Sequence, residues 1–282
     1  MEQILRLFPL CARIVHITLC CVFFTALSEQ KQFVIVIPSY NNRDWYKNNL
    51  DSLCAQTYTQ WRAIYIDDNS PDGTGELVAE YLENCPLKDK FTLIRNSTRQ
   101  WALANHWTAI KLCAPYEIIV HLDGDDWLAD STVLKYLNTI YQDPEIWLTY
   151  GQFVNWPTKA LGYNKPTPAH VIKNNSFRDI EWQWSALRTF YACLAHNIRE
   201  QDLKSEVPPF NGGFITTNAD LALFYPLLEM AGTHIKFIKK IIYIRNVATP
   251  INDFKVNTET QKLGGKVIRA KRRYKPLKKL PL

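Results

Sequence analysis

The sequence predicts an α/β protein built on a mostly parallel β-sheet with helices on its faces. Short apolar runs alternate with amphipathic stretches, and four of these runs begin at residues 33, 61, 91 and 117. Their spacing of 26 to 30 residues is close to the size of a strand–helix–strand unit. Such units join parallel strands through right-handed crossovers, which places helices over the sheet.

The first half of the chain is expected to supply the parallel strands. Strands are predicted at 33–37, 61–66, 91–94 and 117–122, because each is a short apolar run bounded by turn residues. Helices are predicted at 44–56, 75–82 and 101–112, where apolar residues recur at helical spacing.

The second half has a less regular pattern and is expected to be mainly helical. Helices are predicted at 131–141, 179–198 and 219–231, strands at 147–150 and 235–244, and a loop at 156–175. No repeat and no Gly- or Ser-rich linker interrupts the chain. We therefore expect one domain in two halves, 31–130 and 131–265, followed by a basic tail at 266–282.

Composition and charge limit the classes of function. Hydrophobic residues are 47% and charged residues 21% of 282, which excludes a disordered chain. The net charge is +6, but eight basic residues and no acidic ones fall in 266–282, so residues 1–265 carry −2. Nucleic acid is therefore not an expected partner. The tail would contact an anionic membrane, act as a nuclear address, or be a solvated end.

Residues 1–30 resemble a targeting segment. Arg6 and Arg13 precede an apolar run at 14–27, which suits a signal sequence, a short membrane anchor, or an apolar helix packed on the domain. A membrane-associated or secretory location is expected, and a cytoplasm-facing one is left open. Four cysteines outside this segment lack zinc-site spacing and would form two disulfides or remain buried thiols: Cys54, Cys85, Cys113 and Cys193.

Acidic residues follow two of the predicted strands. Asp67 and Asp68 end the second strand, and Asp123, Asp125 and Asp126 follow the fourth. Ligands of open parallel sheets bind at the carboxyl ends of the strands, where these side chains would converge and repel one another. A divalent cation would relieve the repulsion, and oxygen ligands favour Mg²⁺ or Mn²⁺ bound with substrate phosphates. Either Asp67 or Asp123 alone would also suit a helix cap.

Four motifs in order resemble one known family. They are VIPSYN at 36–41, IDDNS at 66–70 with DGT at 72–74, NSTRQWALAN at 96–105, and LDGDDWL at 122–128. Together, over about residues 32–130, they resemble the nucleotide-sugar-binding half of inverting family 2 glycosyltransferases. The resemblance implies a GT-A-type, Rossmann-like fold with a C-terminal helical part on the acceptor side.

The resemblance also implies roles for individual residues. Asp67 or Asp68 would accept a hydrogen bond from the base, commonly uracil, Arg99 would face the donor, and Asp125 would hold the metal with Asp123. Trp101 stands where the family pattern has glycine. The implied nucleotide-sugar-binding residues are Pro38, Ser39, Tyr40, Asp67, Asp68, Arg99, Asp123 and Gly124.

The implied reaction needs a base from the second half of the chain. Asp220 matches the Asp of the family's Glu-Asp motif, although Ala219 replaces the Glu, and it would otherwise be only a first-turn helix acid. It would deprotonate an acceptor hydroxyl of a sugar, lipid or protein, which attacks a UDP-sugar with inversion. Weaker acceptor-side candidates are Trp182, Trp184, Arg188 and Asp253. The two tryptophans would otherwise be core residues.

Two other functions fit parts of the pattern. A nucleotidyltransferase making nucleotide sugars would need a Gly-rich phosphate loop after the first strand, and residues 38–42 contain no glycine. A non-catalytic binder would keep the donor site and lack the base. His121 lies inside a strand run and is expected to be a core histidine with its hydrogen bonds satisfied.

Overall fold

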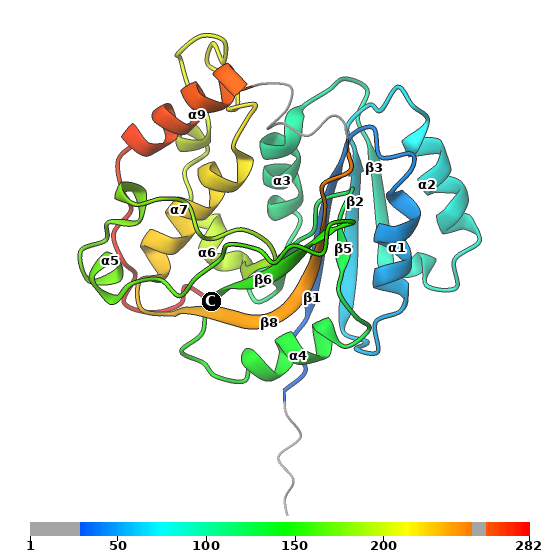
Figure 1. Ribbon diagram of the computed structural model, residues 1–282, viewed down its shortest axis with the longest axis horizontal. Coiled ribbons are helices and arrows are strands. Elements are labelled where there is room, and N and C mark those ends of the chain that lie inside the picture. The colour runs from blue at the N-terminus through cyan, green and yellow to red at the C-terminus, as the bar shows by residue number, and fades with distance from the viewer. Residues whose placement is uncertain (1–28, 250–257) are drawn as a thin grey trace, which may run out of the picture.

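The computed structural model of this protein describes residues 29–249 and 258–282. One eight-stranded sheet has the order β3-β2-β1-β4-β7-β6-β8-β5 (Figure 1). The strands are β1 (Phe33–Ser39), β2 (Trp61–Asp67), β3 (Phe91–Arg95), β4 (Ile118–His121), β5 (Trp127–Leu128), β6 (Leu148–Trp156), β7 (Arg188–Tyr191) and β8 (Ile235–Asn246). The predicted α/β class with a mostly parallel sheet is confirmed.

The first four strands of the chain, β1 to β4, are parallel, as expected. Strand β1 pairs with β2 on one side and with β4 on the other, and β2 pairs with β3. All seven residues of β1 are buried, which explains its continuous apolar sequence. The carboxyl ends of β1, β2 and β4 therefore meet at one edge of the sheet.

Helices cover both faces of this half (Figure 1). Helices α1 (Tyr46–Cys54), α2 (Thr74–Glu83) and α4 (Val133–Ile140) pack on the face that presents Phe33 and Ile35. Helices α3 (Trp101–Lys111), α6 (Ala192–His196) and α7 (Ala219–Ala231) pack on the face that presents Val34 and Val36. This alternation follows from the two-residue period of a strand.

The segment 179–198 is not the helix that the sequence predicts. It begins at the last residue of a short 3₁₀ turn (Phe177–Asp179) and contains the strand β7 and only five residues of helix, α6. Strand β7 lies between β4 and β6, antiparallel to both, and its four residues are all buried. A strand buried on both faces has no alternation of polar and apolar residues, so its sequence cannot be told from a buried helix.

The stretch 156–175 is also more ordered than the predicted loop. Strand β6 extends to Trp156, six residues past the predicted end, and pairs in parallel with β8. A short helix, α5 (Ala169–Lys173), follows. The polar and proline residues of this stretch concealed both elements.

The basic C-terminal segment packs on the domain through part of its residues, while most of its basic side chains are exposed. Its first residues belong to helix α9 (Thr258–Ala270), so the boundary expected at 265/266 falls inside a helix. The Arg178 guanidinium bonds the Glu229 carboxylate of α7 at 2.5 and 2.8 Å and the Ile268 carbonyl at 2.6 Å. The backbone N–H of Leu277 donates to the Met230 carbonyl at 2.9 Å. These buried polar contacts fix the segment's course.

The remaining expectations concern the chain ends and the cysteines. Within residues 29–249 and 258–282, no helix is long and apolar enough to cross a membrane. The targeting segment expected at 1–30 lies, except for its last two residues, outside the described residues. Four cysteines of the described part are free thiols: Cys54, Cys85, Cys113 and Cys193.

Candidate functional site

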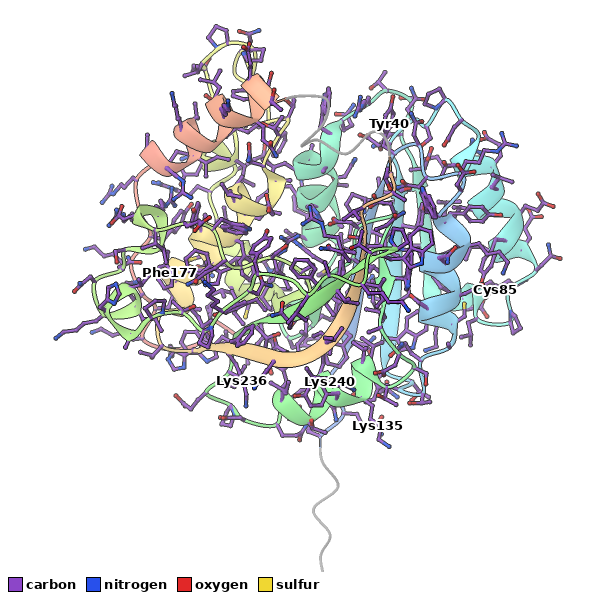
Figure 2. The ribbon with its side chains drawn as sticks, viewed as in Figure 1. Tyr40, Cys85, Lys135, Phe177, Lys236 and Lys240 are labelled. Atoms are coloured by element: carbon purple, nitrogen blue, oxygen red, sulfur yellow. The ribbon has the colours of Figure 1, made fainter. Side chains whose placement is uncertain are left out.

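A cavity of about 570 Å³ lies at the carboxyl ends of the parallel strands. Its walls come from the ends of β1, β4 and β8, from the start of α3 and α7, and from β7. Tyr40 marks this edge of the sheet in Figure 2, and Lys135, Lys236 and Lys240 lie at the opposite side of the molecule. The cavity thus occupies the position predicted for a ligand of an open parallel sheet.

The ends of β1 and β4 meet at a glycine. A Cβ at Gly124 would lie 2.8 Å from Ser39 Oγ and 2.7 Å from Asn42 Nδ2, so no larger residue fits there. Ser39 Oγ accepts hydrogen bonds from Asn42 Nδ2 at 2.9 Å and from Tyr65 Oη at 2.8 Å. Pro38, Ser39 and Gly124 all line the cavity.

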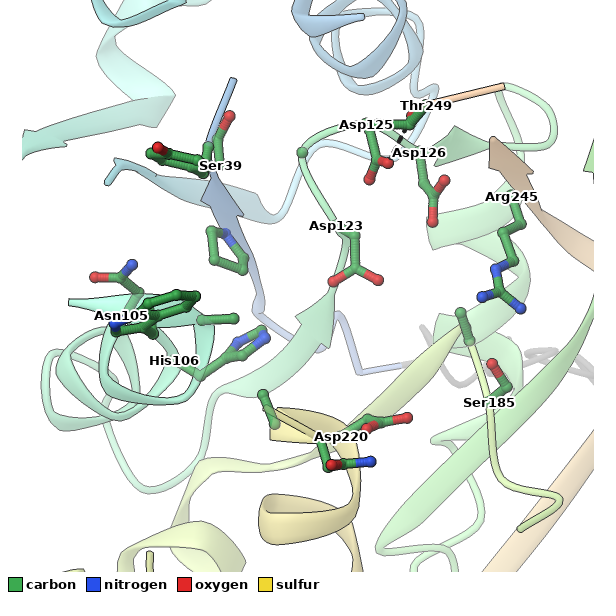
Figure 3. Close-up of a pocket in the computed structure, with 18 of the residues that line it drawn as sticks. Ser39, Asn105, His106, Asp123, Asp125, Asp126, Ser185, Asp220, Arg245 and Thr249 are labelled. Atoms are coloured by element: carbon green, nitrogen blue, oxygen red, sulfur yellow. Dashed lines mark hydrogen bonds between the residues drawn. The ribbon is translucent and has the colours of Figure 1, made fainter. Parts of the chain in front are cut away.

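The three acids after β4 are in different surroundings (Figure 3). Asp126 accepts hydrogen bonds from Tyr243 Oη at 2.5 Å and from the Asn246 N–H at 2.6 Å, so it fastens the end of β8 to this loop. Asp125 accepts one from Thr249 Oγ1 at 3.0 Å. Asp123 and Asp125 both line the cavity.

The acids of this loop repel one another, which favours protonation of a carboxylate or the binding of a cation beside them. Burial, together with the neighbouring Asp123 carboxylate, raises the pKa of Asp125 to about 6. Burial also raises the pKa of Asp126, with Asp125 as the next cause. In the part of the chain that the structure describes, no three His, Cys, Asp or Glu side chains are grouped to hold a metal ion. Asp123 and Asp125 fit a cation that takes its other ligands from a diphosphate and water.

The two acids that end β2 both hold loops. Asp68 is 2% exposed and accepts hydrogen bonds from the Gln100 N–H at 2.7 Å, the Trp101 N–H at 2.8 Å and Asn96 Nδ2 at 2.8 Å. It thereby fixes the loop before α3 and also lines the cavity. Asp67 accepts a hydrogen bond from the Ser70 N–H at 3.3 Å and is not among the lining residues.

Arg99 lies between two aromatic rings at the cavity wall. Its guanidinium carbon is 3.7 Å from the ring centroid of Tyr40 and 3.7 Å from that of Trp101. Trp101 has a φ of +71°, a left-handed conformation that favours glycine. The tryptophan at the family's glycine position thus adopts a backbone conformation that favours glycine and adds a stacking surface for Arg99.

Asp220 stands at the start of α7, across the cavity from Asp123 (Figure 3). Its side chain is 33% exposed, and its Oδ2 lies 3.6 Å from Nη1 of the buried Arg188 of β7. Burial raises the pKa of Asp220 above its ordinary value although Arg188 opposes the shift. A carboxylate of raised pKa that faces a cavity is suited to accept a proton.

The predicted acceptor-side residues separate into three groups. Trp182 and Arg188 line the cavity. Trp184 is a fully buried core residue whose Nε1 donates to Thr167 Oγ1 at 2.8 Å. Asp253 lies outside the described residues.

Several lining residues were not predicted from the sequence. They include Asn105, His106, Ser185, Tyr243, Arg245, Asn246 and Thr249. Three of them belong to β8, whose place at the cavity depends on its parallel pairing with β6. The sequence carries no signal of that pairing. Asn105 is the last residue of a motif of the family resemblance, and His106 follows it directly.

Comparisons with known proteins agree with this geometry. The sequence pattern of the family described as Glycosyl transferase family 2 matches residues 34–199. Over 102 residues the chain is 32% identical to the Escherichia coli UDP-Glc:alpha-D-GlcNAc-diphosphoundecaprenol beta-1,3-glucosyltransferase WfgD, covering 36% of this chain and 38% of that protein. Over 117 residues it is 31% identical to the Salmonella typhimurium O-antigen chain rhamnosyltransferase RfbN, covering 41% and 35%. The aligned region is thus well under half of either relative.

Solved structures share the fold. Staphylococcus aureus TarS 1–349 in complex with UDP-GlcNAc superposes with a TM-score of 0.59 at 14% identity, covering 86% of this chain and 68% of that one. The mannosyltransferase PcManGT from Pyrobaculum calidifontis, in complex with GDP-Man and Mn²⁺, gives 0.55 at 18% identity, covering 88% and 67%. The GT-A-type fold predicted from the motifs is confirmed. With its family pattern matched over more than half its length, this chain belongs to glycosyl transferase family 2.

Proposed function

We propose that the protein is a metal-dependent, inverting glycosyltransferase that moves a sugar from a UDP-sugar to an acceptor hydroxyl. One observation carries the proposal: a single cavity is lined by the acids Asp123 and Asp125 on one side and by Asp220 on the other. A displacement with inversion needs a site for the leaving diphosphate and a base on the opposite face of the sugar. The proposed division into a donor half, 31–130, and an acceptor half, 131–265, follows the same arrangement.

The donor would lie along the ends of β1 and β4. Ser39 and Tyr40 would line the nucleotide, and the Arg99 guanidinium, held between two rings, would face the diphosphate. The uracil base of the nucleotide would form its hydrogen bonds near Asp68. Asp68 already accepts three protein hydrogen bonds, so its main contribution would be to hold the Arg99 loop. The UDP-GlcNAc complex of TarS supports a uridine nucleotide.

Asp123 and Asp125 would hold the metal, Mn²⁺ or Mg²⁺. Of the three acids after β4, all of which line the cavity, Asp126 is committed to Tyr243 and Asn246. Asp123 and Asp125 remain, a set that Mg²⁺ and Mn²⁺ accept together with phosphate oxygens. Such a cation supplies neutralisation of the charge that develops on the departing diphosphate. The Mn²⁺ in the PcManGT complex supports this assignment.

Asp220 would act as the general base. Its raised pKa makes the carboxylate a better proton acceptor, and Arg188 keeps it ionised and oriented. The acceptor would enter past Trp182, which lines the same side of the cavity. A hydroxyl of a sugar, a lipid or a protein fits this chemistry. Asp253 would contact the acceptor, and the two ends of the chain would contact a membrane.

Replacement of Asp220 by Asn tests the mechanism. A panel of UDP-sugars, with Mn²⁺ present and then chelated, is first assayed for UDP release with the wild-type protein. We expect Asp220→Asn to lose at least 100-fold in turnover, the range of general-base contributions, while the Kd for UDP in Mn²⁺ stays within about twofold. Asp89→Asn, at an exposed acid in the first turn of a 3₁₀ helix, is the matched control and should be fully active.

Each arm can contradict a separate part of the proposal. Equal turnover of Asp220→Asn and the wild type would remove Asp220 from the mechanism. UDP release that is unchanged by chelation would remove the metal. Retention of the anomeric configuration in the product, read by proton NMR, would exclude a single displacement.

A further inference from the structure

Two stacked histidines lie at the cavity, and the first of them, His106, lines it. His106 of α3 and His121 of β4 have ring centroids 4.0 Å apart and an interplanar angle of 22°. They are 3% and 2% exposed. His121 is a core residue as predicted, but its Nε2 has no hydrogen-bond partner among residues 29–249 and 258–282, so the expected satisfied state is wrong. Nδ1 of His106 is likewise buried without a partner.

This pair would destabilise the fold if it served packing alone. A buried polar atom without a partner costs about 1 to 3 kcal/mol. His121 contacts Phe190 edge-on, with ring centroids 5.1 Å apart, and the charge of its cross-strand neighbour Arg188 further disfavours protonation of the ring. Two aromatic hydrocarbon rings would fill the same space without that penalty. Unpartnered buried polar groups call for a functional explanation.

The position of His106 supplies one. It lines the cavity, and its imidazole points into the space between Asp123 and Asp220 (Figure 3). In the proposed function this space separates the diphosphate from the base, so the transferred sugar must occupy it. Nδ1 is the nitrogen of the His106 ring that is fully buried without a partner. Nε2 is not among the buried unpartnered atoms, so Nε2 is the nitrogen that can reach a ligand.

The charge state of His106 indicates which group it can bind. Burial lowers the pKa of His106 to about 4, with Asp123 opposing and Arg188 adding to the shift, so the ring is neutral near pH 7. A neutral imidazole nitrogen gives or takes one hydrogen bond, which suits a hydroxyl, whereas a diphosphate favours cations such as Arg99.

We propose that His106 is a specificity-determining residue whose Nε2 hydrogen-bonds a hydroxyl of the transferred sugar. The inference rests on the proposed function, because it takes the sugar to lie between Asp123 and Asp220. His121 stacks behind the ring and limits its rotation.

The test compares three variants on the UDP-sugar that the wild type uses best. His106→Phe keeps the ring volume and the stacking but has no nitrogen, and His106→Gln can return a polar group near the Nε2 position. His170→Gln, at an exposed histidine of α5, is the matched control. Steady-state kinetics are measured with the intact donor and with its monodeoxy analogues, and Kd is measured for UDP alone.

We expect His106→Phe to lower kcat/KM for the intact donor about tenfold, the value of one neutral hydrogen bond, with the Kd for UDP within twofold of wild type. For one monodeoxy analogue, wild type and His106→Phe should be equal, because the hydroxyl that His106 binds is missing. His106→Gln should recover part of the loss, and His170→Gln should behave as wild type. If His106→Phe does not fold, as judged by circular dichroism, His106→Leu replaces it.

The outcomes separate this inference from the proposed function. A loss that is uniform across all deoxy analogues, a parallel loss of UDP affinity, or no loss at all would overturn the role of His106 while transfer by the wild type stands. A wild-type protein that transfers no sugar from any donor would overturn the proposed function, and this inference with it.

Discussion

Removal of the Asp68 carboxylate should destabilise the protein far more than removal of an exposed acid that accepts similar hydrogen bonds. Asp68 accepts the N–H groups of Gln100 and Trp101 and the side-chain amide of Asn96, all within 2.8 Å, and it is 2% exposed. Asp68→Ala leaves these donors at the partly buried start of α3 without their acceptor. The chain offers a matched comparison in Asp130, whose Oδ1 accepts the N–H and hydroxyl of Thr132 at the surface.

The magnitude follows from the type of bond. A hydrogen bond to a charged group is worth about 1.5 to 3 kcal/mol, and water entering from the cavity would replace part of it. For the two backbone donors we therefore expect Asp68→Ala to lower the free energy of unfolding by about 3 to 4 kcal/mol. Asp130→Ala, which removes an exposed turn acceptor and an exposed ion pair with Lys240, should cost about 1 kcal/mol.

Urea unfolding followed by circular dichroism measures both variants against the wild type. UDP binding should also weaken in Asp68→Ala, because the loop from Asn96 to Trp101 carries Arg99. A loss of less than 1 kcal/mol in Asp68→Ala, or a loss equal to that of Asp130→Ala, would refute the reasoning.

Three further predictions follow. Trp101→Gly should be about 1 kcal/mol more stable than Trp101→Ala, since only Ala keeps the penalty of the +71° backbone, and the opposite order in urea unfolding would contradict this. Arg178→Met should lower the free energy of unfolding by about 3 to 5 kcal/mol, because it leaves the Glu229 carboxylate buried without its partner, while Arg273→Ala at an exposed pair should lose under 1 kcal/mol. In metal-free buffer Asp125→Asn should gain stability relative to wild type as pH rises from about 4 through 6. Over this range the raised pKa of Asp125 means that the folded wild type must either keep its proton or ionise a buried carboxyl, whereas the unfolded chain ionises freely. A stability difference that does not change with pH would exclude this.

The parallel half of the fold could be read from the sequence because its strands are marked at both ends. Each of the four runs is apolar, has the length of a strand and is followed by turn residues, and the structure places them within a few residues of the predicted ranges. Strand β7 could not be read, because burial on both faces removes the periodicity that distinguishes strands from helices. The wrong helix at 179–198 follows directly from this.

The candidate site divides in the same way. Asp123, Asp125 and Arg99 follow or flank strands of the regular half, so their convergence could be inferred before the structure was known. Arg245, Asn246 and Thr249 reach the cavity only through the pairing of β6 with β8, which is a long-range contact without a local signature. Asp126 shows a further limit. The sequence groups it with its neighbours, whereas its hydrogen bonds to Tyr243 and the Asn246 backbone make it a structural tie.

Helix α7 carries the proposed base at its start and the anchor of the C-terminal segment near its end. Asp220 stands in its first turn, and Glu229, nine residues and about 13 Å farther along the helix axis, is the residue to which the C-terminal segment is fastened through Arg178 and the Tyr274 N–H. Proteolysis or truncation ahead of Ile268 would therefore do more than shorten the protein. It would remove the Ile268 carbonyl from Arg178 and the Tyr274 N–H from Glu229, two partners of the buried ion pair on the helix that carries the proposed base, so variants shortened at this end should lose turnover and thermal tolerance together.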